Sequence, residues 1–433
     1  MRILVLSQYW WPENGVPQRR WSWLTSILIK QGHEVYVIAP PPREKKSTSV
    51  GVFHRHVSLT IADPEVGPSG EYIYRCGYLA TNSSLTYRAL NQAFVALSTV
   101  MVGVRLCRDG RFPKPELLVG TVPALPTALA TRLLAKLLQV RYVIDLRDAW
   151  PDLVDYSALW NQGVGKMSRR ERVLRRGPVQ LVSRYVKKML PAIYKRSSAM
   201  ILTSDYLRES LLEQMRAGDR LEQPRFVTIR NVFPAQVDAR GARTEARTPG
   251  ELNVLYAGTL GRAQQLSNAV EAVRIAREKG YEVNLRLVGA GATSRALRAQ
   301  VRATDLPIKI YGKANPETLS GHYAWADTAL VHLTDWEPLK AAVPSKTFEL
   351  MRMGIHISGS VAGEAADLIE SLEAGDVVPP QDPLALANLW CELIDDRSRL
   401  SISAKARSWI DQEESVETPR KVRALIQSIK DQH

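Results

Sequence analysis

The segment from Pro344 to Glu349 combines residue types that suit a phosphate group and the hydroxyls of a sugar. Pro344 ends a loop and Ser345 is a favourable helix cap, so the sequence predicts a helix that begins here, soon after a buried strand. The free backbone N–H groups and the dipole of such a helix start attract a phosphate, and Lys346 adds a positive charge. Glu349 follows Ser345 by one helical turn on the same face. A carboxylate there can accept hydrogen bonds from both ribose hydroxyls.

Other glycines and charged residues directly follow predicted strands. Gly15 lies in the loop after the strand expected at 3–6, where a missing side chain lets the backbone approach a ligand. Arg147 and Asp148 follow the strand expected at 142–146. Asp148 either accepts a proton from an acceptor hydroxyl or caps the following helix. The candidates expected in turns after strands of the second half are Gly258, Gly261, Arg262 and Gly289.

The sequence contains no pattern typical of a metal site. It has no Asp-x-Asp tripeptide and no cluster of His, Cys and carboxylate residues with ligand spacing. His33 lies between Gly32 and a strand start, which favours a structural turn, and His332 and His356 lie in strand patterns. We therefore expect chemistry that needs neither a metal ion nor a bound cofactor.

These residues are carried by strands that alternate with helices in both halves of the chain, which predicts an α/β fold with two doubly wound, Rossmann-like domains. Two such domains facing each other create a cleft at the carboxyl ends of both sheets. The expected boundaries are a first domain at 1–235, a linker at 236–250, a second domain at 251–412, and a helix at 413–433 that packs back on the first domain.

The 433 residues are 45% hydrophobic and 24% charged, which is typical of a globular protein, and the net charge is +14. Three distant cysteines favour a reducing compartment. The longest uncharged stretch, 89–104, falls short of the roughly 20 apolar residues of a membrane span. The segment 166–196 holds eleven basic residues and one acidic residue, interleaved with Val and Leu. Basic amphipathic helices there are expected to bind an anionic membrane, although a solvated helix face is the alternative.

Four stretches of the sequence, in this order, resemble a known family. They are 12–15 with 32–35, 145–151, 256–264, and the run 343–351 followed by Gly354, 361–365 and 375–383. Together they resemble family 4 glycosyltransferases of the GT-B fold, most closely the bacterial branch that builds capsular, O-antigen and other surface polysaccharides. The resemblance runs from residue 1 to about residue 430, with a weaker patch at about 40–110.

The resemblance implies retaining transfer of a sugar from a nucleoside-diphosphate sugar to an acceptor hydroxyl, with a UDP-sugar favoured over a GDP-sugar. It gives Glu349 the ribose and places the Gly15 loop against the diphosphate and the acceptor. Arg147 stands where members often have a histidine that contacts the donor sugar.

The sequence departs from the family pattern at two places. Ala341 stands where many members have a glutamate that contacts the donor sugar. Thr259 and Gln264 stand where an arginine and a lysine commonly bind the diphosphate. We therefore expect Arg262 and Lys346 to neutralise the leaving diphosphate.

Two other functions stay open at this point: a sugar-nucleotide epimerase on the same fold, and a non-catalytic membrane-binding protein on a degenerate transferase scaffold. An oxidoreductase is disfavoured because no G-x-G-x-x-G motif follows the first strand. The expected partners are a nucleotide sugar, a lipid-linked or glycan acceptor and an anionic membrane, without nucleic acid. The expected location is the cytoplasm, peripherally on the inner face of the cell membrane.

Overall fold

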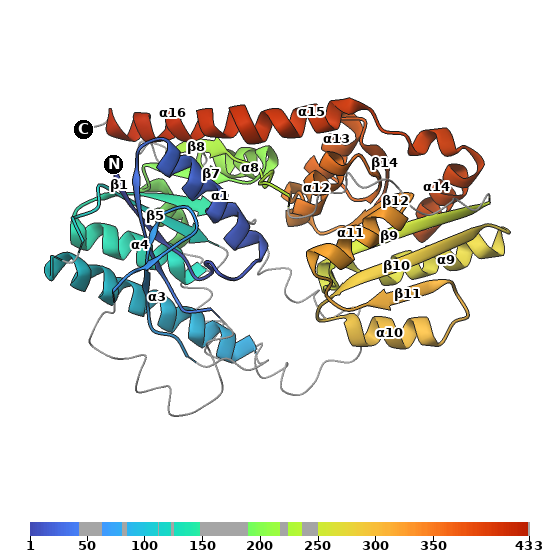
Figure 1. Ribbon diagram of the computed structural model, residues 1–433, viewed down its shortest axis with the longest axis horizontal. Helices are drawn as coiled ribbons and strands as arrows, with labels where there is room; N and C mark the ends of the chain where they lie inside the picture. The colour runs from blue at the N-terminus through green and yellow to red at the C-terminus, as the bar shows by residue number, and fades with distance from the viewer. Residues whose placement is uncertain are drawn as a thin grey trace. The chain divides into compact units, whose positions relative to one another are not determined.

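The structure is a computed structural model that describes residues 1–42, 63–79, 85–110, 112–122, 125–147, 189–216, 224–235 and 250–431. It contains two compact units, each built on its own sheet (Figure 1). The first unit comprises the described residues of Met1–Pro151, Ser168–Phe233 and Thr418–His433, and the second those of Pro234–Glu417. The predicted α/β class with two doubly wound domains is confirmed.

The first unit is built on an eight-stranded sheet. In spatial order its strands are β3 (Glu65–Val66), β4 (Tyr72–Arg75), β2 (Glu34–Ala39), β1 (Arg2–Leu6), β5 (Leu117–Val122), β6 (Arg141–Leu146), β7 (Ala199–Leu202) and β8 (Arg225–Thr228). Each neighbouring pair is parallel except β3 with β4. The four residues 3–6 of β1 are wholly buried, as a central parallel strand requires.

Helices cover both faces of this sheet. They are α1 (Val16–Lys30), α3 (Leu85–Arg108), α4 (Leu125–Leu138), α8 (Asp205–Arg216) and α16 (Thr418–Lys430). α1 buries Trp21, Leu24 and Leu28 at helical spacing and ends before Gly32, whose φ is +82°. The carboxyl-terminal α16 lies beside α1, where Gln31 donates a hydrogen bond to the Pro419 carbonyl (2.8 Å). α3 and α4 cover the opposite face of the sheet (Figure 1).

The second unit has a fully parallel sheet of six strands. In spatial order they are β11 (Ile308–Tyr311), β10 (Glu282–Ala290), β9 (Glu251–Thr259), β12 (Thr328–His332), β13 (His356–Ser360) and β14 (Gly375–Val378). The helices are α9 (Ser267–Glu278), α10 (Ser294–Arg302), α11 (Pro316–Trp325), α12 (Ser345–Met353), α13 (Glu364–Ser371), α14 (Pro383–Asp395) and α15 (Ala404–Gln412). Read along the chain, the order is 3-2-1-4-5-6, which is the doubly wound arrangement of dinucleotide-binding domains.

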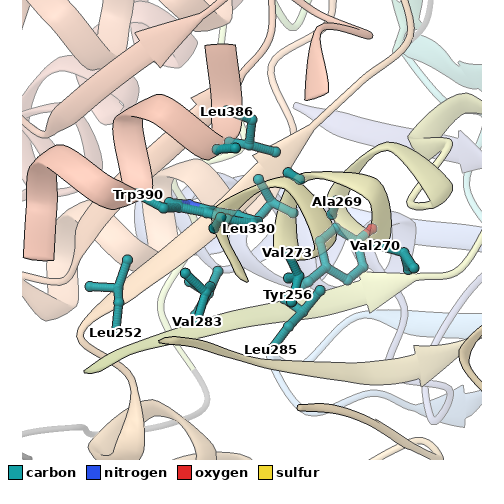
Figure 2. Packing of buried hydrophobic residues seen from close by; sticks show 14 of the residues in the cluster. Leu252, Tyr256, Ala269, Val270, Val273, Val283, Leu285, Leu330, Leu386 and Trp390 are labelled. Carbon is teal, nitrogen blue, oxygen red and sulfur yellow. The ribbon is translucent and has the colours of Figure 1, made fainter. Parts of the chain in front are cut away.

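The core of the second unit joins the sheet to the helices α9 and α14 (Figure 2). Trp390 of α14 is wholly buried and lies among apolar side chains of the strands and of α9. The labelled residues of this cluster are Leu252, Tyr256, Ala269, Val270, Val273, Val283, Leu285, Leu330, Leu386 and Trp390. Burial of large side chains from both helices holds the strands whose carboxyl ends carry the candidate site.

Two local predictions in this unit were wrong. The strands β9 and β10 continue through Gly258 and Gly289, which we expected in turns, because Thr259 and Ala290 still pair. The cap of α12 is Pro344, with no side-chain hydrogen bond, and Ser345 is the first helical residue. The helix N-terminus is at the expected place, but the Ser345 hydroxyl does not cap it.

Candidate functional site

The strand order of the second unit places a topological switch point between β9 and β12, which are parallel neighbours. Ligands of doubly wound sheets bind at the carboxyl ends of the strands beside such a point. β9 leads into the turn Arg262–Gln264, and β12 leads through a short 3₁₀ helix, Glu337–Ala341, into α12. The predicted site residues Gly261, Arg262, Ser345 and Lys346 therefore all follow the carboxyl ends of two adjacent strands.

The first turn of α12 carries a compact polar cluster. The ammonium nitrogen of Lys346 lies 3.0 Å from a Glu349 carboxylate oxygen, and it donates a hydrogen bond to the Tyr323 hydroxyl at 2.8 Å. That hydroxyl in turn donates to the same carboxylate oxygen at 3.2 Å. The Glu349 side chain is 8% exposed and the Lys346 side chain is 30% exposed. A buried carboxylate is thus held by a lysine that still reaches solvent.

Arg262 begins the turn after β9 and has a different environment. Its Nε lies buried with no hydrogen-bond partner among the described residues. The turn is attached to the segment after β12, because the Thr334 N–H donates to the Ala263 carbonyl (2.8 Å). Burying an N–H of a cation without an acceptor is costly, so this guanidinium is suited to meet an anion.

The glycines near this edge divide into two kinds. Gly289 has a φ of +149°, and a Cβ there would lie 1.8 Å from the Gly258 carbonyl oxygen, so this glycine is required by strand pairing. Gly261 has an extended backbone that any residue adopts. A Cβ on Gly261 would meet only the movable end of Gln264, at 2.6 Å. A side chain at Gly261 would therefore require only that Gln264 move, whereas Gly289 is required by the fold.

The loop after β1 of the first unit also contains a glycine whose built Cβ would meet a glutamine three residues later. Gly15 caps α1 in an extended conformation, and a Cβ there would lie 2.6 Å from the amide oxygen of Gln18. Gly15 precedes Gln18 by three residues, as Gly261 precedes Gln264. In this loop, however, Gln18 donates to the carboxylate of Glu13 at 2.8 Å, so its position is held by an acidic neighbour.

The carboxyl end of β6 carries a buried ion pair that we did not predict from the sequence. Arg20 and Asp145 both have side chains with 0% exposure, and the guanidinium lies 2.8 Å from the carboxylate. Trp21 donates to the other carboxylate oxygen at 2.8 Å. The sequence feature that could have predicted this pair is an aspartate inside an apolar strand, because a buried charge needs a partner of opposite sign.

Of the two residues predicted to act after β6, the structure describes Arg147 but not Asp148. Arg147 is half-buried, and its carbonyl accepts a hydrogen bond from the Thr203 hydroxyl at 2.9 Å. Asp148 lies outside the described residues. The basic segment 166–196 also lies outside them, except for its last eight residues, 189–196.

Glu337 does not take the place of the glutamate that the family pattern has at Ala341. Glu337 is the nearest acidic residue in this 3₁₀ helix, and its side chain is 69% exposed. It forms a salt bridge with Lys340, at 2.7 Å. Glu337 therefore does not supply a buried carboxylate at this place.

Two histidines of the second unit, His332 and His356, lie within strands of the sheet. Burial lowers the pKa of His332, at the end of β12, to about 4, and its Nε2 lies 2.9 Å from the Asn268 amide nitrogen. An amide nitrogen donates, so this contact suits a neutral His332 whose Nε2 accepts. His356 lies between the Thr328 hydroxyl (2.8 Å) and the Asp376 carboxylate (3.0 Å). Within the described ranges, no group of three or more His, Cys, Asp or Glu residues is arranged to hold a metal ion.

Comparison with known proteins finds a family model and relatives that are similar to this chain. Residues 251–396 match the family model described as glycosyl transferases group 1. A putative colanic acid biosynthesis glycosyl transferase, WcaI of Escherichia coli K12, is 24% identical over 360 residues, which span 82% of each chain.

Solved structures share the fold across the whole chain. Sucrose-phosphate synthase from Thermosynechococcus elongatus has a TM-score of 0.62 at 18% identity, covering 100% of this chain and 96% of the other. Anabaena Alr3699/HepE in complex with UDP-glucose has a TM-score of 0.60 at 15% identity, covering 99% and 100%. The chain therefore has the GT-B fold that the sequence predicted, and its residues 251–396 match the family model of group 1 glycosyl transferases.

Proposed function

We propose that the protein is a retaining glycosyltransferase that moves a sugar from UDP-sugar to an acceptor hydroxyl during surface polysaccharide or glycolipid assembly. The observation that carries the proposal is the edge of the second sheet beside its switch point. There, Arg262 keeps a buried N–H without an acceptor among the described residues, and the first turn of α12 holds Lys346 against Glu349. The similarity to WcaI supports a role in polysaccharide assembly, and the HepE complex with UDP-glucose supports the choice of nucleotide.

Each side chain has a defined task in this proposal. Glu349 accepts hydrogen bonds from the ribose hydroxyls, and its carboxylate is oriented by Lys346 and Tyr323. Lys346 and Arg262 stabilise the negative charge that develops on the departing diphosphate. Two fixed cations give this stabilisation without a metal ion, so we propose metal-independent transfer.

The first unit is proposed to contribute the acceptor side. Gly15 has no side chain, and its loop is proposed to lie against the donor diphosphate and the acceptor, as the family resemblance implies. Arg147 follows β6 and is proposed to contact the donor sugar, and Asp148 is proposed to accept the proton of the acceptor hydroxyl. The acceptor is proposed to be a glycan or a lipid-linked saccharide.

The direct test is product analysis with UDP-sugars and GDP-sugars in the presence and absence of saccharide acceptors. Transfer from a UDP-sugar with retention at the anomeric carbon, undiminished by a chelator, is the expected outcome. Conversion of the nucleotide sugar without an acceptor identifies an epimerase instead. Binding without any turnover supports a non-catalytic protein.

Asp148→Asn tests the assignment of the proton acceptor. General-base catalysis contributes about 10²–10⁴-fold to rate, so turnover should fall by about that factor while UDP affinity is unchanged. The matched control is Asp109→Asn, which makes the same substitution at an exposed aspartate just after α3. Turnover of Asp148→Asn within twofold of wild type removes Asp148 from the mechanism.

A further inference from the structure

The helices α3 and α4 of the first unit expose apolar side chains that the proposed transferase site does not use. Five of the eleven most exposed large hydrophobic side chains in the described part of the chain lie on these two helices. They are Leu90 (54%), Leu97 (56%), Met101 (53%), Leu133 (48%) and Leu137 (56%), and together they define the α3–α4 surface.

The exposed residues are spaced for one face of each helix. Leu97 and Met101 follow Leu90 by seven and eleven residues, and Leu137 follows Leu133 by four, so each set is aligned along its helix. The two helices pack closely at Gly103 of α3, where a Cβ would lie 2.6 Å from a methyl group of Leu134 in α4. Their outward apolar faces therefore belong to one surface.

The charges beside these apolar residues are of one sign. Neither α3 nor α4 contains an aspartate or glutamate. Arg108 and Lys136 are exposed, and Arg132 is half-buried. Arg105 pairs with Asp109, just beyond the end of α3, at 3.4 Å. An apolar face bordered by basic residues is typical of helices that lie in the interface of an anionic membrane.

α3 has the length and composition of a membrane span, but its packing favours another placement. The stretch Leu90–Arg108 has a mean hydropathy of 1.4, and 39% of that window is buried. The buried residues, which include Val95, Val100 and Leu106, face the protein, while the exposed ones form the opposite stripe. A helix with one face committed to its own domain presents only the other face to lipid.

We propose that the α3–α4 surface docks the protein on an anionic lipid bilayer, with its leucines and Met101 in the acyl boundary and its basic residues at the headgroups. A second copy of the chain fits less well. A twofold contact sets the same patch against itself. Arg108 and Lys136 would then face basic residues of the partner, and neither helix offers an acid to pair with them. This surface differs from the segment 166–196, which the sequence predicted to bind the membrane.

The test is flotation of the full-length protein with vesicles of phosphatidylcholine, with and without phosphatidylglycerol, at low and high salt. Wild type should float with the anionic vesicles and lose most of that binding at high salt. Arg108→Glu/Lys136→Glu should weaken binding by at least ~20-fold, because each basic residue at an anionic surface contributes about fivefold. Leu97→Glu/Met101→Glu should weaken it comparably, since two charges would enter the acyl boundary.

Two matched variants isolate the surface. Leu384→Glu/Val416→Glu changes two equally exposed apolar residues of the second unit, at 52% and 54%, and should bind vesicles like wild type. Lys187→Glu/Lys188→Glu removes charge from the segment 166–196. Thermal melting shows whether each variant is folded like wild type.

Three results overturn the proposal. One is a wild type that does not float with anionic vesicles. Another is wild-type vesicle binding by the folded Leu97→Glu/Met101→Glu variant. If Lys187→Glu/Lys188→Glu then abolishes vesicle binding, the segment 166–196 is the membrane-binding element instead. The third is a wild-type dimer in sedimentation that Leu97→Glu/Met101→Glu converts to monomer, which assigns the surface to self-association.

Discussion

The carboxyl ends of the two sheets carry charged residues of similar type in opposite arrangements. In the first unit, the guanidinium of Arg20 is wholly enclosed by Asp145, by the Ile229 carbonyl (2.8 Å) and by the Asn231 side chain (3.2 Å). In the second unit, Arg262 keeps a buried Nε without a partner in the described part of the chain, and Lys346 is 30% exposed. The first edge is closed by protein partners, and the second still has donors to offer.

This difference separates a structural charge from a binding charge. An enclosed ion pair cannot exchange its partner for a ligand without exposing a buried charge, which costs several kcal/mol. A half-exposed lysine and an unsatisfied guanidinium gain a partner when an anion arrives. The same chemical groups therefore stabilise one unit and prepare the other for a ligand.

The largest expected effect breaks the closed edge. Asp145→Asn leaves the Arg20 guanidinium buried without its counter-charge, and we expect a loss of about 3–5 kcal/mol in the free energy of unfolding. Urea denaturation measures it. Asp109→Asn is the control, because that aspartate pairs with Arg105 at the surface, where a salt bridge contributes less than about 1 kcal/mol. Equal losses in the two variants would contradict the distinction between closed and open charges.

The second effect concerns which groups carry positive charge at the open edge. Burial lowers the pKa of His332 to about 4, against 6.5 in the unfolded chain, so the unfolded state binds more protons between these values. The stability that this difference provides is present above pH 6.5 and is lost as the pH falls toward 4, by about 3 kcal/mol.

His332→Gln tests this assignment, because an amide oxygen can accept the hydrogen bond of Asn268 but does not titrate. Between pH 7 and pH 4.5, wild type should lose more unfolding free energy than the variant, whose stability should depend less on pH. If both proteins lose stability equally on acidification, His332 is not the titrating group. Neutral His332 leaves Arg262 and Lys346 as the cations that we assign to this edge.

The positions of the strands could be predicted from the sequence, because buried parallel strands read as short apolar runs. The predicted strands at 3–6 and 142–146 differ from β1 and β6 by one residue each. Gly258 and Gly289 were misplaced because glycine in a sequence indicates a turn, whereas here it allows two strand backbones to approach closely.

The partners of charged residues could not be predicted, because they come from elements far apart in the chain. Tyr323 lies 26 residues before Glu349 and on another helix, and no spacing rule connects them. Arg20 and Asp145 are separated by 125 residues. The sequence therefore predicted Lys346 and Glu349, which share a helical turn, but missed the residues that hold or enclose such charges.

The third prediction separates the role of the two cations at the open edge from the role of the Glu349 carboxylate. Arg262→Ala should weaken UDP binding by roughly 10- to 100-fold and leave uridine binding nearly unchanged, because a hydrogen bond to a charged group contributes about 1.5–3 kcal/mol. Lys346→Ala should weaken UDP binding by a similar factor and uridine binding by a smaller one, because Lys346 also orients Glu349. Glu349→Ala should weaken UDP and uridine alike, because both contain the ribose. Titration calorimetry measures the affinities, and Lys340→Ala, a lysine paired with exposed Glu337, serves as control. Unchanged UDP affinity in both cation variants would leave backbone amides as the phosphate ligands.

The smallest expected effect tests whether the open edge is prepared before the ligand binds. The Tyr323 hydroxyl accepts from Lys346 at 2.8 Å and donates to Glu349 at 3.2 Å, so it orients both groups without being a ligand itself. Tyr323→Phe removes one such link and keeps the ring, and a neutral hydrogen bond contributes about 0.5–1.5 kcal/mol. We therefore expect UDP and uridine affinity to fall by roughly two- to tenfold, less than in Glu349→Ala. In the double variant Tyr323→Phe/Glu349→Ala the tyrosine substitution should cost almost nothing further, because its effect acts through the carboxylate. Additive losses would show that Tyr323 contacts the nucleotide directly.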